Sequence, residues 1–147
     1  MKKFLLLITV SIFLLIVATA WSNSLSKKDP DVLSTNGIHF HPQLEIYIKG
    51  EKQEIPKNIG LAGIHNPIHT HEDLPIIHLE FSGKVRKDDV KLGKFFQVWN
   101  KDFSSEKILG YENGPEGTVS MLVNGELNNE FEKYEMHDGD KIEIRYE

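Results

Sequence analysis

The clearest helical pattern in the chain lies between residues 92 and 103, and it limits the folds open to the whole sequence. Apolar side chains fall there at positions i, i+3, i+4, i+7 and i+11, namely Leu92, Phe95, Phe96, Trp99 and Phe103. Asp88 or Asp89 is expected to cap the start of this helix. A helix that packs on a sheet needs such a stripe, so we interpret the aromatic residues as core rather than as a ligand-stacking surface.

Segments with the alternating pattern of strands lie on both sides of this helix. The sequence predicts hairpins over residues 44–55 and 64–81, a third hairpin that begins at residue 119 and turns at Asn124-Gly125, and a last strand over residues 142–146. The order is therefore hairpin, hairpin, helix, hairpin, strand. This order predicts an α+β fold, in which one sheet is covered on one face by a single main helix.

The first 20 residues are typical of a secretory signal peptide or of an N-terminal membrane anchor. Lys2 and Lys3 precede an apolar run of 18 residues that ends at Trp21, and residues 18–20 form a small-x-small cleavage site. Either interpretation predicts a secreted or extracytoplasmic protein, anchored by residues 4–21 if the segment is not cleaved. Residues 21–37 have no sustained hydrophobic period and are expected to be a polar tether, which leaves residues 38–147 as a single domain.

Composition excludes several classes of function. The chain has no Cys, which excludes disulfides, thiolate metal sites and cysteine nucleophiles. It has 17 Lys and Arg residues, two of them in the first 20 residues, against 22 Asp and Glu residues, so the rest of the chain is acidic and binding to nucleic acid is not expected. There is no glycine-rich phosphate loop, GxSxG motif or HExxH motif. Any metal ion must therefore be bound by histidine, carboxylate or water.

Histidines are concentrated in one part of the sequence, since six of the seven lie within residues 39–78. His69 and His71 are two residues apart, so on a strand they project from the same face. A loop over residues 72–75 pairs His69 with His78 across the second hairpin, where opposed Cβ atoms lie about 5 Å apart. We therefore expect His69, His71 and His78 to form one metal site, an arrangement that a one-residue change of register would destroy.

Three imidazoles suit Zn²⁺ or Cu²⁺ better than Ca²⁺ or Mg²⁺, which prefer oxygen ligands. His39 and His41 form a second pair that can complete this site, form another one, or orient its ligands. Glu80 shares a strand face with His78 and is expected to orient a ligand or to act as a base toward a metal-bound water, and Glu72 is a weaker candidate for the same role. His65 and His137 lie in predicted loops and are assigned no role.

Two resemblances add to this interpretation. The VNG turn at residues 123–125 and the DGDKIEI sequence at 138–144 resemble the closing half of a β-grasp domain of the ubiquitin-like and transcobalamin-C-terminal type, which implies a mixed sheet wrapped around the helix at residues 92–103. The motifs IHFHPQLEIYIKG, IPKNIG, IHTHEDLPIIHLEF and LGKFFQVW resemble an uncharacterised group of small secreted prokaryotic proteins, which implies that the histidine pattern is one unit. The segment HTHEDLPIIH is also similar to a cupin histidine pair, but it lacks the expected glutamate spacing and glycines.

Three functions are compatible with these observations. The first is an extracytoplasmic protein that binds Cu²⁺ or Zn²⁺ as a carrier, buffer or sensor, and it is favoured because it requires only ligands. The second is a histidine-ligated metalloenzyme, either a zinc hydrolase or a carbonic-anhydrase-like enzyme, which needs an open coordination position for water. The third is a cell-surface module that binds an extracellular protein partner and carries a structural metal. Contact with a membrane is expected only through the N-terminal segment.

Overall fold

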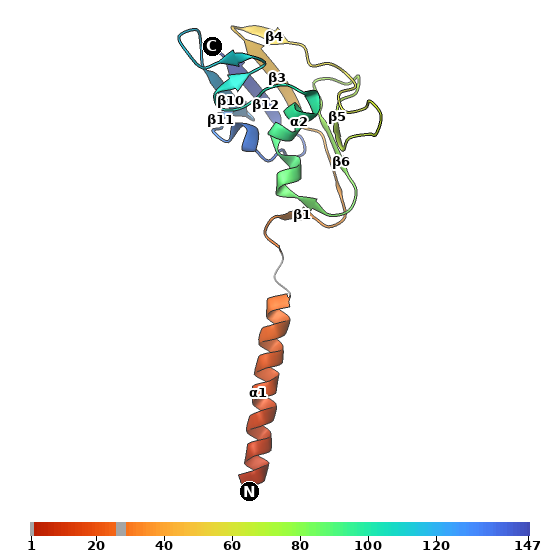
Figure 1. The fold of residues 1–147 in the computed structure, drawn as a ribbon, viewed down its shortest axis with the longest axis vertical. Helices are drawn as coiled ribbons and strands as arrows, with labels where there is room; N and C mark the ends of the chain where they lie inside the picture. Colours follow the sequence, from red (N-terminus) through yellow and green to blue (C-terminus); the bar gives the residue numbers. More distant parts are fainter. Residues whose placement is uncertain (1, 26–28) are drawn as a thin grey trace. The chain divides into compact units, whose positions relative to one another are not determined.

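The protein is described by a computed structural model that covers residues 2–25 and 29–147. The chain divides into two compact units, Met1–Pro30 and Asp31–Glu147. In the first unit the helix α1 runs from Lys2 to Leu25 (Figure 1). Among residues 2–25 and 29–147, no helix combines the length and the hydropathy that crossing a membrane requires.

The second unit contains short strands and one main helix. Its elements are β1 (Val32–Ser34), β2 (Ile38–Phe40), β3 (Gln43–Ile48), β4 (Glu51–Gln53), β5 (Ile68–His69), β6 (His78–Phe81), β7 (Val85–Arg86), η1 (Lys87–Val90), α2 (Leu92–Trp99), β8 (Lys107–Ile108), β9 (Tyr111–Glu112), β10 (Val119–Val123), β11 (Glu126–Leu127), η2 (Phe131–Lys133) and β12 (Lys141–Tyr146). The range predicted as a tether is thus partly structured, because α1 continues to Leu25 and β1 pairs with β7 inside the second unit.

The largest sheet of the second unit has the strand order β11-β10-β12-β3-β4. Strands β12 and β3 are parallel, whereas the other neighbouring pairs in this sheet are antiparallel. The hairpins predicted at residues 44–55 and from residue 119 are confirmed as β3–β4 and β10–β11. Asn124 and Gly125 both have positive φ, 54° and 87°, as a two-residue hairpin turn requires. The fold is therefore α+β with a mixed sheet, and the β5–β6 pair belongs to a separate three-stranded sheet with the order β2-β6-β5.

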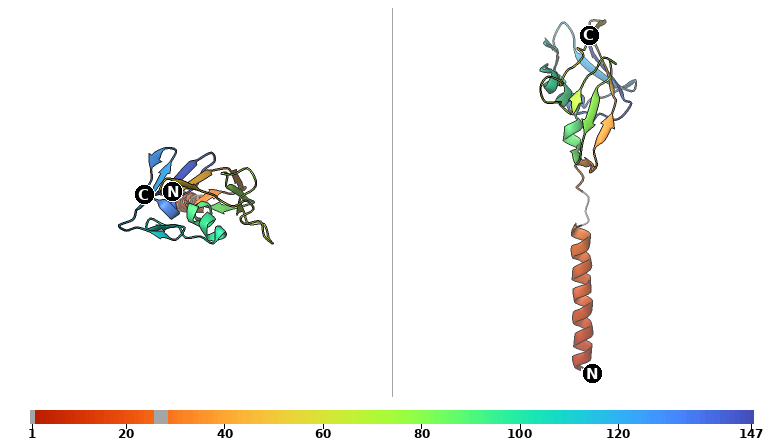
Figure 2. Two further views of the ribbon diagram at one scale, coloured as in Figure 1. Left: turned by 90° about the horizontal axis from the view of Figure 1, so that it is seen from above. Right: turned by 90° about the vertical axis from the view of Figure 1, so that its right-hand side faces the viewer.

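The core lies between the five-stranded sheet and α2, which packs on one face of that sheet (Figures 1 and 2). Strand β3 shows the alternation clearly, because Leu44, Ile46 and Ile48 are buried while the residues between them are partly exposed. Phe95 and Phe96 of α2 belong to the same buried cluster. The aromatic residues of the helix are thus core residues, as predicted.

The boundaries of α2 differ from the prediction at both ends. The helix ends at Trp99 because Asn100 adopts the left-handed conformation and donates its backbone N–H to the carbonyls of Phe96 and Gln97. Phe103 therefore lies beyond the helix, but it remains buried and its ring centroid is 4.6 Å from that of Phe96. The predicted cap was also wrong, because Lys91 precedes α2 without a side-chain cap.

The two aspartates expected to cap α2 have other partners. The Asp89 carboxylate accepts the backbone N–H of Arg86 at 2.8 Å, at the start of η1. Asp88 accepts a hydrogen bond from Lys91 at 2.7 Å. The acidic pair thus organises the short 3₁₀ turn that precedes the helix.

Candidate metal centre

The small sheet β2-β6-β5 has apolar side chains on one face and candidate metal ligands on the other. Leu79 is fully buried in the hydrophobic core, and the neighbouring residues His78 and Glu80 project from the opposite face of β6. Across the strands, His69 lies directly opposite His78, and His39 lies directly opposite Glu80. The predicted register of His69 and His78 is thus confirmed, and one face of this sheet presents imidazoles and a carboxylate.

Thr70 fixes the pair of histidines that flank it. Its side chain is fully buried, donates a hydrogen bond to the carbonyl of Pro56 at 2.9 Å and accepts the backbone N–H of Ile59 at 3.1 Å. Its backbone also donates to the carbonyl of Ile59 at 3.1 Å and accepts the N–H of Asn58 at 3.0 Å. Because the Thr70 side chain points toward residues 56–59, the side chains of His69 and His71 both point to the opposite side of this chain segment.

Gly60 allows residues 56–60 to pass close to β5. Its φ is +76°, and a Cβ at this position would lie 2.5 Å from the carbonyl oxygen of Ile68. Any side chain would push this segment away from the strand. The IPKNIG motif is therefore part of the support of the site.

His69 directs an unprotonated ring nitrogen toward His71. Its Nδ1 lies 3.0 Å from the carbonyl of Asn66 and must donate the hydrogen bond, which leaves Nε2 of the neutral ring as a lone pair. That Nε2 is 3.1 Å from Nε2 of His71, close to the roughly 3.3 Å between two nitrogens on a tetrahedral ion with bonds of about 2.0–2.1 Å. Burial lowers the pKa of His69 and so favours the neutral ring, which is the form that binds metals.

His78 is oriented by Asp73. Its Nε2 donates to the Asp73 carboxylate, whose oxygens lie 3.1 and 3.2 Å away, and this hydrogen bond lowers the pKa of Asp73. Nδ1 of His78 is therefore the free lone pair of the neutral ring. It is buried and has no hydrogen-bond partner among the described residues. A buried nitrogen without a partner is costly in a native protein, and a bound cation satisfies it.

Glu80 lies at the centre of the cluster. Its Oε1 is 3.1 Å from Nε2 of His39, 3.7 Å from Nδ1 of His78 and 4.0 Å from Nε2 of His69. One ligand atom each from His69, His71, His78 and Glu80 lies within 4.8 Å of the others. We call these four residues the inner set. These four donor atoms could therefore hold one metal ion.

A second group of donors overlaps with the first. One nitrogen each from His39, His41 and His78 also lies within 4.8 Å of the others, and we call this group the outer set. His41 is held by Asp138, whose carboxylate accepts the His41 backbone N–H at 2.8 Å. The side chains of His39 and His41 are 62% and 40% exposed, whereas those of His69 and His78 are 4% and 10% exposed. His39, found only in the outer set, is thus far more exposed than His69, found only in the inner set, whereas Glu80 of the inner set is itself 45% exposed.

Other candidates from the sequence lie outside both sets. Glu72 forms an ion pair with Lys57 at 2.8 Å. His65 lies near the inner set, with its ring centroid 6.0 Å from that of His69, and His137 lies 3.5 Å from the carboxylate of Asp140. Sequence reasoning missed Asp73 and Asp138. The position of Asp73 in the loop between His71 and His78 was a usable signal, whereas Asp138 is 97 residues from His41 and no local pattern indicates their contact.

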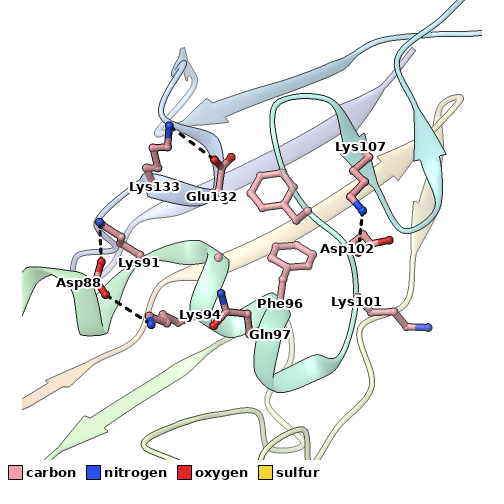
Figure 3. Close-up of a pocket in the computed structure, with 12 residues that line it drawn as sticks. Asp88, Lys91, Lys94, Phe96, Gln97, Lys101, Asp102, Lys107, Glu132 and Lys133 are labelled. Atoms are coloured by element: carbon pink, nitrogen blue, oxygen red, sulfur yellow. Dashed lines mark hydrogen bonds and ion pairs between the residues drawn. The ribbon is translucent and has the colours of Figure 1, made fainter.

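A hollow of about 380 Å³ beside α2 is lined by none of these histidines (Figure 3). Lysines line much of it, and most of them are paired with acids. Asp88 lies 2.7 Å from Lys91 and 3.6 Å from Lys94, and Asp102 lies 3.1 Å from Lys107. The hollow therefore contains compensated surface charges, and the histidine cluster remains the candidate site.

Comparison with protein families, curated proteins and solved structures finds no match for this chain. The functional argument therefore depends on the geometry and the chemistry of the histidine cluster.

Proposed function

We propose that this chain is an extracytoplasmic protein that binds Zn²⁺ or Cu²⁺ through the inner set and acts as a carrier, buffer or sensor of that ion. The observation that carries the proposal is the buried Nδ1 of His78, which has no hydrogen-bond partner within residues 2–25 and 29–147 and lies 3.7 Å from the Glu80 carboxylate. Three imidazoles and one carboxylate provide four ligands, enough for a tetrahedral ion without water. Such a filled coordination shell suits binding and storage better than catalysis.

The choice of ion follows from the ligand types. Cu⁺ prefers thiolate and thioether ligands, but the chain has no Cys, and Met121 and Met136 are both buried in the hydrophobic core. Neutral imidazole binds both Zn²⁺ and Cu²⁺. We therefore propose a divalent ion and expect zinc and copper(II) to compete for the same ligands.

A metalloenzyme is the second candidate, and the exposure of Glu80 favours it. The Glu80 side chain is 45% exposed, so it can remain unbound and act as a base toward a water on a three-histidine ion. X-ray absorption at the zinc edge, recorded with and without added azide, distinguishes the two functions. A spectrum that azide leaves unchanged supports storage, and a spectrum that changes because azide replaces a bound water supports catalysis.

We further propose that the second unit is a β-grasp domain. The strand order β4-β3-β12-β10-β11, the parallel central pair and the helix between the two hairpins all support this assignment. The proposed similarity to the group of small secreted prokaryotic proteins depends on the sequence motifs alone. Residues 1–20 are proposed to be the signal peptide or anchor that sends this domain out of the cytoplasm.

Thermal unfolding with and without added Zn²⁺ tests the binding proposal. A ligand that binds only the folded state at 100 times its Kd stabilises that state by about 2.7 kcal/mol. We expect Zn²⁺ to raise the melting temperature of the full-length chain and EDTA to reverse the change. A melting temperature that neither zinc nor copper(II) alters would contradict the proposed function.

A further inference from the structure

The inner and outer sets share one residue, His78, and this sharing limits how many ions the cluster can hold. Nε2 of His78 is hydrogen-bonded to Asp73, so Nδ1 is the nitrogen left for an ion. One lone pair binds one ion. An ion in the inner set therefore excludes an ion in the outer set, and the cluster offers two alternative positions for a single ion.

The two positions differ in what can reach them. Of the residues found in one set only, His39 of the outer set is 62% exposed and His69 of the inner set is buried, while His41 and His71 are both partly exposed. An ion that arrives bound to another molecule must be contacted before its first ligands have left. Among the five imidazoles of the two sets, that of His39 is the exposed one, and it is therefore placed to make that contact. The outer set therefore suits capture, and the inner set suits retention.

His78 and Glu80 lie within reach of both ion positions. His78 belongs to both sets, and its ring lies between them, with centroids 4.9 Å from His41 and 4.7 Å from His71. Glu80 lies 3.1 Å from Nε2 of His39 and 4.0 Å from Nε2 of His69, so its carboxylate also reaches both sides. An ion can therefore exchange ligands one at a time without leaving the cluster.

We propose that His39 and His41 capture a chelated divalent ion and pass it to His69 and His71, while His78 and Glu80 remain in contact with it. This inference rests on the proposed function. On capture, the bonds from the ion to the chelator break as bonds to His39 and His41 form. In the transfer, the bonds to His39 and His41 break as bonds to His69 and His71 form. No electron is transferred, and the total charge of the protein and its ion does not change during the transfer. The donor is a small chelate whose ligands exchange readily.

The experiment measures transfer of Zn²⁺ from the fluorescent chelator mag-fura-2 to the full-length chain in detergent micelles, by stopped-flow fluorescence. The wild type is compared with H39A/H41A, with H69A/H71A and with H137A, a control that removes an exposed histidine outside both sets. Native mass spectrometry gives the number of ions bound, and circular dichroism checks folding. H39Q/H41Q repeats the test if the alanine variant does not fold.

We expect the wild type and H137A to bind one ion at equal rates. H39A/H41A is expected to slow the transfer at least tenfold and to change the equilibrium Kd less than threefold. H69A/H71A is expected to keep a fast first phase and to raise the Kd at least 100-fold. Two ions per wild-type chain, a wild-type rate in H39A/H41A, or equal losses of affinity in both double variants would each overturn the inference and leave the proposed function intact. Absence of zinc binding by the wild type would overturn both.

Discussion

Replacement of Thr70 by valine tests whether the segment at residues 56–59 supports the histidine pair. The Thr70 hydroxyl is fully buried and makes two hydrogen bonds, one to the carbonyl of Pro56 and one from the N–H of Ile59. Valine keeps the volume and leaves both backbone groups without a partner. Each buried polar group without a partner costs about 1–3 kcal/mol, so for the two groups we expect T70V to lower the free energy of unfolding by about 2–6 kcal/mol.

Thr70→Ser is the matched control, because serine keeps the hydroxyl and removes one methyl group, at a cost of about 1 kcal/mol. Urea denaturation of the metal-free protein gives both free energies. Thermal unfolding is expected to show a decrease of roughly 10 °C for T70V. The affinity for zinc should also fall in T70V, since His69 and His71 lose their common anchor. If T70V were as stable as T70S, the proposed anchoring of the pair would be refuted.

Three further predictions concern single residues. D73A is expected to weaken zinc binding about 10–100-fold in a competition titration, because His78 loses the partner that orients its ring, whereas E72A should bind as the wild type does. The lowered pKa of His69 means that the folded state binds fewer protons than the unfolded state. Stability is therefore fully present above about pH 6.5 and decreases as the pH falls toward the folded pKa, and H69Q should flatten this dependence in urea denaturation at a series of pH values. Asp140 is buried and accepts three hydrogen bonds, so D140A is expected to cost about 2–4 kcal/mol by the same measurement, and a loss below 1 kcal/mol would contradict this account.

Local sequence patterns predicted the individual strands better than their arrangement. Alternating apolar residues and the Asn124-Gly125 turn define β3 and β10–β11, because side-chain alternation and turn geometry are properties of neighbouring residues. The pairing of β3 with β12 joins opposite ends of the domain and has no local signal. Phe103 shows a second limit of sequence-based prediction. A buried Phe at this position is compatible with a longer helix or with the loop that follows a shorter one, and the left-handed conformation of Asn100 ends the helix before it.

In the candidate site, too, local features were predicted and long-range contacts were not. The spacing of His69 and His71 and the length of the loop before His78 were enough to predict their common face, because register follows from the turn and the two-residue repeat. The groups that orient these rings come from elsewhere. Asp138 and the Pro56 carbonyl reach the site through tertiary packing. Sequence reasoning therefore identified the ligand candidates but not most of their support.

The most direct test of the central claim is the metal content of the purified full-length chain, measured by elemental mass spectrometry after incubation with zinc or copper(II) and removal of free ions. The variant H69A/H71A/H78A removes the three imidazoles of the inner set, and H137A removes an exposed histidine outside it. We predict about one ion per chain in the wild type and in H137A, and loss of that ion in the triple variant. Equal metal content in all three proteins, or none in the wild type, would contradict the account.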